Sequence, residues 1–462
     1  MKKGKWPKRA LWILVLASPA LLVFFAVLSS ASTPRSTASP EAMGASNGYV
    51  VLAWNNLGMH CIDRDYSNMS ILPPYNVLRA QVIKIGDPPR FVTSGITVSY
   101  SFPGNTQSVT KTNFWTYAMK LFHLSAPLPP NVGLTGKGLT GTLDLVQDPV
   151  LGEYFEAAGI PLTEYFDKDK KLKHPYPFQL AKITVRDARG QLLAKTLTVA
   201  PISSELMCVM CHADTADATT RYPIKPTGKV ETNILALHDY LNQANPLAHL
   251  NGKSLLASQP VQCADCHADN ALGAPGIAGI ESLSLAMHNH HNNDCLAYPA
   301  TCVSDVTPDT TSGCYNCHPG PKTQCLRDVM SEQYAFNCTT CHGNMAMPAS
   351  PGAFHESTWA TMGVAPSITA GRKPWLEEPK CSDAACHGPG YAMDQPLFQN
   401  SRGHGGIYCE GCHDSTHAIA KSREPNDAIK FVQLQGQAGS LRKCTVCHKT
   451  QPASGFQHSW AH

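Results

Sequence analysis

The sequence predicts an α+β chain with two unequal parts: an N-terminal β-sandwich-like domain at residues 48–204, then a loop-rich, mainly α domain at residues 205–462. Two observations lead to this division. In the first part, runs rich in Val, Ile, Leu and aromatic residues alternate with Pro- and Gly-containing turns. In the second part, seven copies of a short motif of cysteine and histidine follow one another.

The first part reads as a series of strands. One helix is expected at residues 113–122, and residues 187–190 form a plausible hairpin loop between the last two runs. Several strands separated by turns favour two packed sheets of Greek-key type. The expected strands cover residues 49–54, 77–85, 96–102, 140–146, 178–186 and 191–200.

The motif of the second part is Cys-x-x-Cys-His, the attachment sequence of c-type haem. Its two thiols form thioethers with the haem edge, and the adjoining histidine becomes the proximal iron ligand. Chance would give roughly 0.03 matches in a chain of this composition, against six found. The six are Cys208–Cys211–His212, Cys263–Cys266–His267, Cys314–Cys317–His318, Cys338–Cys341–His342, Cys409–Cys412–His413 and Cys444–Cys447–His448.

A seventh copy, Cys381–Cys386–His387, has four residues between its cysteines. It resembles the wider spacing of small tetrahaem cytochromes. Zinc sites also use Cys-x-x-Cys pairs, but they do not require a histidine directly after each pair. A thioredoxin-like redox pair would occur once, in a βαβ context. The sequence therefore predicts seven haem c groups, six at strict motifs and one at the stretched motif.

Seven motifs within residues 205–462 leave roughly 37 residues per haem, too few for an ordinary core. We therefore expect short helices and long loops packed around the haems. The spacing between motifs is irregular, which argues against a solenoid.

Each iron that only passes electrons needs a sixth ligand, and histidines outside the motifs are numerous enough to supply it. His404 and His417 bracket the sixth motif, and a histidine so near its own motif more often reaches a neighbouring haem. His123 and His174 fall in the first part, where a surface role is expected, and the terminal His462 is expected to fray. The candidate distal ligands are His238, His249, His288, His290, His291, His355, His404, His417 and His458.

Four cysteines lie outside the motifs, an even number that permits two disulfides in an oxidising compartment. Cys295 and Cys302 are seven residues apart in a Pro-containing loop, so we expect them to pair. Cys61 and Cys325 would then join the two parts of the chain. Free buried thiols remain an alternative, as does a role for His60 and Cys61 as metal or haem ligands.

Residues 1–31 combine a basic start with an apolar stretch and resemble a cleavable signal peptide, although an uncleaved membrane anchor is also long enough. Residues 32–47 suit a flexible linker. Removing residues 1–31 changes the net charge from +3 to −2, which does not suggest a nucleic-acid partner. Haem attachment and the many cysteines indicate export to the periplasm, the outer-membrane surface or the extracellular space.

The chain resembles the multihaem c-type cytochromes of respiratory and extracellular electron transfer. The stretches that carry this resemblance are Leu52–Cys61, Cys314–Cys325 and His404–His417. The resemblance implies a multihaem cytochrome c domain that carries electrons along close, mostly bis-His haems. The implied partners are an upstream quinol-linked cytochrome and a downstream acceptor or terminal reductase, with a membrane or outer-membrane partner for the N-terminal domain.

Two alternatives to an electron carrier stay open. One is a redox enzyme with a single open-coordination haem, acting on a small nitrogen or sulfur compound. Ammonia-forming nitrite reductases carry a Cys-x-x-Cys-Lys motif, which this sequence lacks, so conduction is favoured over catalysis. The other is a membrane-anchored cytochrome that oxidises quinol, if residues 1–31 stay in place.

Overall fold

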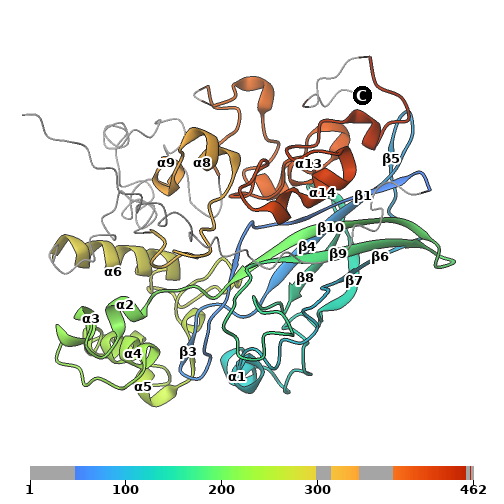
Figure 1. Cartoon of the computed structure of the whole chain (residues 1–462). Helices are drawn as coiled ribbons and strands as arrows, with labels where there is room; N and C mark the ends of the chain where they lie inside the picture. The colour runs from blue at the N-terminus through green and yellow to red at the C-terminus, as the bar shows by residue number, and fades with distance from the viewer. Residues whose placement is uncertain (1–46, 298–313, 343–377, 385, 454–457, 459–462) are drawn as a thin grey trace, which may run out of the picture. The chain divides into compact units, whose positions relative to one another are not determined.

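The computed structural model of the chain describes residues 47–297, 314–342, 378–384, 386–453 and 458 (Figure 1). All of them belong to one compact unit, Met43–His462, so the two sides of the expected boundary at residues 204 and 205 lie in the same unit. The expected signal peptide lies outside the described residues. No described helix is long and apolar enough to cross a membrane.

The centre of the fold is one nine-stranded sheet. Its strand order is β1-β4-β8-β7-β6-β9-β10-β2, and β5 pairs with β4. Neighbouring strands are antiparallel, except that the short β2 runs parallel to the end of β10. The strands are β1 (Tyr49–Asn55), β2 (His60–Cys61), β4 (Asn76–Lys84), β5 (Arg90–Phe91), β6 (Ile96–Ser101), β7 (Thr140–Asp148), β8 (Gly152–Ile160), β9 (Phe178–Asp187) and β10 (Leu192–Ser203).

The sheet is curled, which corrects the expected two-sheet sandwich. Strands β1 and β10 lie far apart in the strand order, yet they pack against each other. The main apolar core lies inside this curl and takes buried side chains from β1, β4 and β6 to β10. The sandwich prediction failed because alternation shows that a strand has one buried face, but does not show whether a second sheet or the same sheet covers it.

All six strands expected from the sequence are present, with ends shifted by a few residues, and the expected helix is α1 (Phe114–Leu121). The hairpin between β9 and β10 is confirmed, closed by a hydrogen bond from Gly190 N–H to the Asp187 carbonyl, at 2.9 Å. Strand β8 was missed because its sequence, GEYFEAAGI, is rich in glycine, glutamate and alanine, which are uncommon in strands.

The expectation of a mainly α second domain is also wrong. After residue 205 the described helices are few, and most are short. The α-helices are α2 (Val209–His212), α3 (Asp217–Thr220), α4 (Val230–Leu241), α5 (Leu255–Ser258), α6 (Leu283–Ala297), α8 (Val329–Tyr334), α9 (Cys338–His342), α13 (Cys409–His413) and α14 (Pro425–Gln435). The 3₁₀ turns are η1 (Pro246–Ala248), η2 (Cys263–Asp265), η3 (Pro389–Tyr391), η4 (Phe398–Asn400), η5 (His404–Gly406) and η6 (Cys444–Val446).

Strand β1 explains how the second half attaches to the sheet. Val51 and Ala53 point into the curl, whereas Val50, Leu52 and Trp54 join a separate apolar cluster with residues from the C-terminal part of the chain. Because β1 is covered on both faces, nearly all of it is buried. Helix α14 packs on β10 and β9 from the same C-terminal part (Figure 1).

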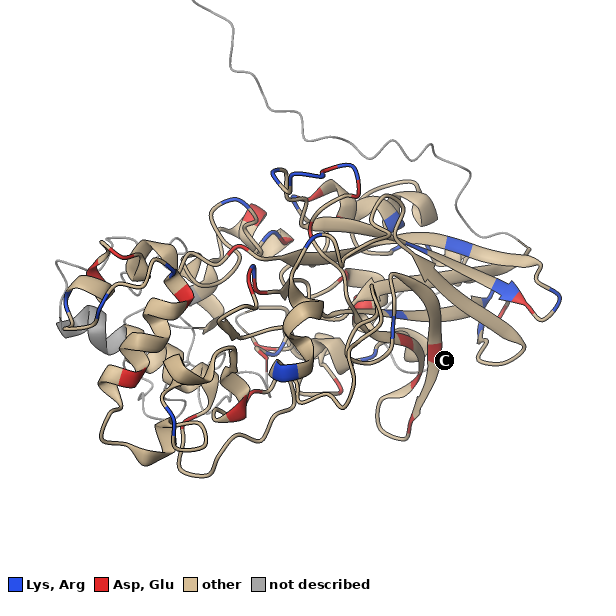
Figure 2. Cartoon of the chain, turned by 90° about the horizontal axis from the view of Figure 1, so that it is seen from below, with Lys and Arg blue, Asp and Glu red and all other residues tan. Residues whose placement is uncertain are grey.

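Backbone hydrogen bonds also join the sheet half to the motifs. Gly86 forms a parallel bridge with His448, and β3 (Met69–Ser70) pairs with β11 (Val261–Gln262), which leads directly into Cys263. Acidic and basic residues are interspersed along the described chain (Figure 2). The sheet therefore acts as the scaffold on which several motifs are fixed.

Candidate functional site

The seven motifs, numbered 1 to 7 in chain order, share a local shape. In the strict copies at Cys208, Cys263, Cys314 and Cys444, the histidine N–H donates to the carbonyl of the first cysteine, at 2.9–3.0 Å. Motifs 4 and 6 are the short helices α9 and α13. Each strict motif is thus a single helical turn, which brings both thiols and the imidazole to neighbouring positions.

The stretched motif 5 reaches a similar closure with a longer chain. The N–H of His387 donates to the carbonyl of Cys381, at 3.2 Å, across six residues instead of four. The extra residues form a turn in which Cys386 N–H and Gly388 N–H both donate to the Asp383 carbonyl, at 2.9 and 3.0 Å. The first cysteine and the histidine therefore keep the same backbone contact as in the strict motifs.

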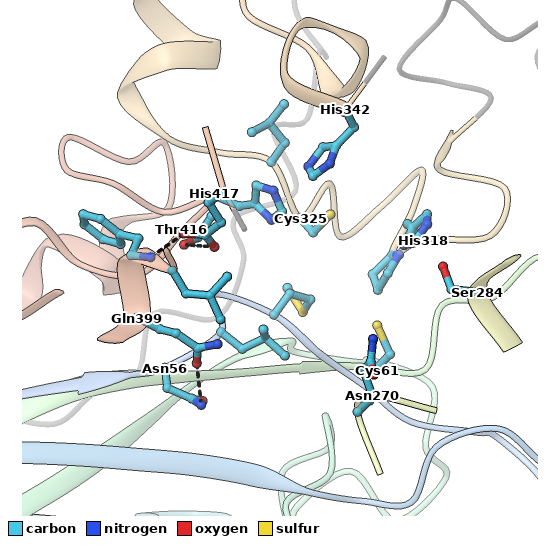
Figure 3. A pocket seen from close by; sticks show the side chains of 18 of the residues that line it. Asn56, Cys61, Asn270, Ser284, His318, Cys325, His342, Gln399, Thr416 and His417 are labelled. Atoms are coloured by element: carbon cyan, nitrogen blue, oxygen red, sulfur yellow. Dashed lines mark hydrogen bonds between the residues drawn. The ribbon is translucent and has the colours of Figure 1, made fainter. Parts of the chain in front are cut away.

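All 14 motif cysteines and all seven motif histidines line one connected cavity of about 3040 Å³. A pocket for one small ligand usually measures about 300–1,000 Å³, so this cavity is several times larger. Most of its lining is apolar, as a flat macrocycle requires. Figure 3 shows one region of it, around His318, His342 and His417.

Histidines outside the motifs stand opposite those inside them. Among the described residues, seven ring contacts join two histidines, and six of these pair one motif histidine with one histidine outside the motifs. The distances between ring centres are 6.4 Å for His212–His291, 6.4 Å for His267–His238, 6.1 Å for His318–His288, 6.1 Å for His342–His417, 5.8 Å for His413–His458 and 6.1 Å for His448–His404.

These distances match two imidazoles on opposite sides of one metal ion. A metal–imidazole bond is about 2 Å long and the ring centre lies roughly 1 Å beyond the nitrogen, so the two centres are about 6 Å apart. Each ring can turn about its metal–nitrogen bond, so the spread of interplanar angles, from 23° to 89°, is compatible with this arrangement.

In several of these histidines, Nδ1 contacts a carbonyl or carboxylate oxygen, which fixes the ring and leaves Nε2 as the nitrogen that a metal would use. The Nδ1 atoms of His267, His288 and His291 lie 2.7–2.8 Å from the carbonyl oxygens of Glu281, Ser284 and Met287. A ligating histidine commonly donates its other N–H to a carbonyl or carboxylate, which fixes the tautomer and leaves Nε2 as the ligand. His448 has a carboxylate in this position, with Nδ1 lying 3.5 Å from Oδ1 of Asp87.

Burial also keeps imidazoles neutral, which iron ligation requires. It lowers the pKa of His318, His413 and His417 to about 4, because a charged ring loses its hydration in the interior. His417 has in addition a left-handed backbone, with φ of +65°. This conformation is costly for a residue other than glycine and is concentrated at functional positions.

Three candidates are not placed opposite a described motif histidine. His249 follows η1 and makes no ring contact with one. His290 lies edge-on to His291, with ring centres 5.4 Å apart. His355 lies outside the described residues, and so does His462. The surface role of His123 and His174 is confirmed, since their side chains are 71% and 83% exposed.

The spare cysteines behave differently from one another. Cys61 and Cys325 are separate thiols that both line the cavity, and burial raises the pKa of Cys61 to about 12. His60 is buried in β2 and is not part of the cavity lining, and burial lowers its pKa to about 4. Cys302 lies outside the described residues, so its pairing with Cys295 remains a prediction.

Sequence reasoning missed the residues that orient the ligands. Asp87 follows β4 in a turn, and the carbonyls of Glu281, Ser284 and Met287 carry no side-chain signal at all. Only the spacing could have suggested two of them, because Ser284 and Met287 lie four residues before His288 and His291, one turn earlier if this segment is a helix.

In comparisons with known proteins, the chain matches no family model, no curated protein and no solved structure.

Proposed function

We propose that this protein binds seven haem c groups and carries electrons between other redox proteins outside the cytoplasm. The observation that supports this most strongly is the set of six histidine pairs, each joining one motif histidine to one histidine outside the motifs at about 6 Å. Random contacts among the 18 described histidines would be mixed about half of the time, against six of the seven found.

Different side chains would attach the haem and bind its iron. Two thiols of each motif would attach the haem edge, and the paired histidines would bind the iron from both sides. When bound, haem c supplies an iron that gains or loses one electron. Ligation by two histidines would leave no open position for a substrate at the six paired motifs, which favours a carrier over an enzyme.

The ligand set also bears on the reduction potential of the haems. The cavity wall around His318 and His417 is mostly apolar. Two imidazole ligands favour low reduction potentials relative to histidine–methionine ligation, whereas an apolar surrounding shifts the potential upward. We expect the partners to be an upstream quinol-linked cytochrome and a downstream acceptor in the periplasm or at the cell surface.

The test uses the full chain, produced with haem attachment. A reductive titration should take up seven electrons per protein, and the oxidised and reduced spectra should both be low-spin. Adding nitrite or hydroxylamine should leave these spectra unchanged. A high-spin signal that shifts with nitrite or hydroxylamine would contradict the carrier and support an enzyme, and a protein purified without bound haem would overturn the proposal altogether.

A further inference from the structure

We propose that the seven motifs form a branched row in space. The order 2–1–3–4–6 makes up the row, and motifs 5 and 7 both adjoin motif 6. This inference rests on the proposed function, since the order matters only if the motifs hold haem. It differs from the order along the chain, and each junction is supported by its own contacts.

Helix α6 joins motifs 1 and 3. His288 and His291 are three residues apart on this helix and therefore lie on the same side of it. His291 faces His212 of motif 1, and His288 faces His318 of motif 3. A backbone hydrogen bond from Met207 N–H to the Asn316 carbonyl, at 3.0 Å, ties the same two motifs together.

Helix α4 joins motifs 1 and 2. The side-chain amide of Asn233 donates to the His212 carbonyl of motif 1, at 2.9 Å. His238, five residues later on the same helix, faces His267 of motif 2. The two positions are about 7.5 Å apart along the helix axis, so α4 holds motifs 1 and 2 at neighbouring positions. No other motif is joined to motif 2 by a described contact of this kind, which places motif 2 at one end of the row.

Motifs 3 and 4 meet through their cysteines. The side chains of Cys314 and Cys338, the first cysteines of the two motifs, lie within hydrogen-bonding distance of each other. Figure 3 shows His318 of motif 3 and the pair His342–His417 around the same region of the cavity.

Motif 6 supplies the ligand that faces motif 4. His417 comes four residues after His413 and lies opposite His342. The intervening turn is held by hydrogen bonds from Ala420 N–H to the His413 carbonyl, at 2.7 Å, and from Arg327 N–H to the His417 carbonyl, at 2.9 Å. The segment that leaves motif 6 therefore bridges to motif 4.

The other side of motif 6 faces motif 7. His404 comes five residues before Cys409 and lies opposite His448. In return, the N–H of Leu441, three residues before motif 7, donates to the Cys412 carbonyl at 2.8 Å.

Motif 5 reaches motif 6 through a series of rings. Ring centres are 5.4 Å apart for His387–Tyr391, 4.8 Å for Tyr391–His458 and 5.8 Å for His458–His413. Glu378 also accepts hydrogen bonds from Phe398 N–H and the Thr416 hydroxyl, on either side of motif 6. Motif 6 is thus the only described motif with three neighbours, so it forms the junction of the row.

Paired alanine variants of the haem-loaded full chain test this order by paramagnetic resonance of the oxidised protein. His288→Ala, His291→Ala and His404→Ala should each convert one low-spin haem into a high-spin one, and added imidazole should restore the low-spin signal if the fold is kept. His290→Ala is the matched control on α6 and should leave all signals low-spin.

The double variants then report whether the two altered haems are close together, because magnetic coupling falls steeply with the distance between two paramagnetic centres. His288→Ala/His291→Ala alters the neighbouring motifs 3 and 1, so its high-spin signal should be broadened and weaker than the sum of the two single variants. His288→Ala/His404→Ala alters the distant motifs 3 and 7 and should give the simple sum.

The outcomes separate this inference from the proposed function. Single variants that behave as expected, with a simple sum for His288→Ala/His291→Ala or strong coupling for His288→Ala/His404→Ala, would overturn the order while the carrier proposal stands. Haem-bound single variants that stay low-spin would overturn the ligand pairs on which the order depends. A protein without haem would overturn the proposed function itself.

Discussion

Arg327 and Asp427, one hundred residues apart in the chain, form a fully buried ion pair with two parallel hydrogen bonds. Nε of Arg327 lies 2.7 Å from Oδ2 of Asp427, and Nη2 lies 3.0 Å from Oδ1. The guanidinium also donates to the carbonyls of Gly58 and Cys325 and lies over the ring of Phe178, 4.8 Å from its centre. It therefore ties the sheet half to α14, while the backbone N–H of Arg327 donates to the His417 carbonyl, at 2.9 Å.

Replacing Arg327 by methionine should destabilise the protein by about 3–5 kcal/mol, because the Asp427 carboxylate would stay buried without its partner. Urea unfolding of the haem-loaded protein measures this change. Arg423–Glu332 is the matched control, since both side chains are more than one-third exposed. Arg423→Met should change stability by less than about 1 kcal/mol. Equal effects of the two substitutions would contradict the role given to the buried pair.

Replacing His417 by glycine should create one high-spin haem without disturbing the backbone. The left-handed φ of +65° at this position suits glycine better than histidine. Optical spectra should show a single high-spin centre that returns to low spin when imidazole is added. His249→Ala is the control, because this ring faces no described motif histidine. An entirely low-spin His417→Gly protein would show that His342 has another partner.

The double substitution Cys381→Ala/Cys386→Ala should remove one haem. The stretched motif keeps the backbone contact between its first cysteine and its histidine, so we expect it to bind haem as the other motifs do. The intact mass should correspond to seven haems in the natural protein and six in the variant. The control is Cys444→Ala/Cys447→Ala at strict motif 7, which should lower the intact mass by one haem. Six haems in both the natural protein and the motif 5 variant would show that motif 5 is empty.

Asp63 should make the protein less stable as pH rises. Burial raises the pKa of its carboxyl to about 7, while hydrogen bonds from Ile71 and Leu72 N–H oppose this shift. An acid whose pKa is higher in the folded state favours folding below the unfolded pKa of about 4, and this contribution is lost as pH rises through about 7. The loss should reach roughly 4 kcal/mol in full, of which roughly 3 kcal/mol falls between pH 5 and pH 8.

Urea unfolding at pH 5 and pH 8 tests this dependence. Asp63→Asn keeps an oxygen acceptor for the Ile71 and Leu72 N–H groups but cannot ionise, so its stability should change less between the two pH values. Asp148, whose carboxyl is exposed, serves as the control, and Asp148→Asn should keep the dependence of the natural protein. An Asp63→Asn protein with the same pH dependence as the natural one would exclude this carboxyl as the cause.

The sequence allowed local elements to be predicted better than their assembly. The alternating residues of β9 and β10 and the turn at Asp187 identified a hairpin correctly. The closure of the sheet did not follow from these patterns, because the contact between β1 and β10 depends on the accumulated twist of all the strands between them.

The same limit applies to the candidate site. The motif histidines are recognisable because three ligands are adjacent in the sequence, whereas His404 and His448 meet only through tertiary packing. The cluster at residues 288–291 shows this most clearly. Helical geometry places His288 and His291 on one side of α6, and the sequence alone could not separate them from His290 before the helix was known.

Near-infrared magnetic circular dichroism of the fully oxidised, haem-loaded protein tests the central claim most directly, since its charge-transfer bands distinguish two histidine ligands from histidine–methionine and from high-spin iron. The six histidine pairs predict a bis-histidine band with the intensity of at least six haems. A bis-histidine band worth fewer than six haems, with the remainder in histidine–methionine or high-spin bands, would contradict it.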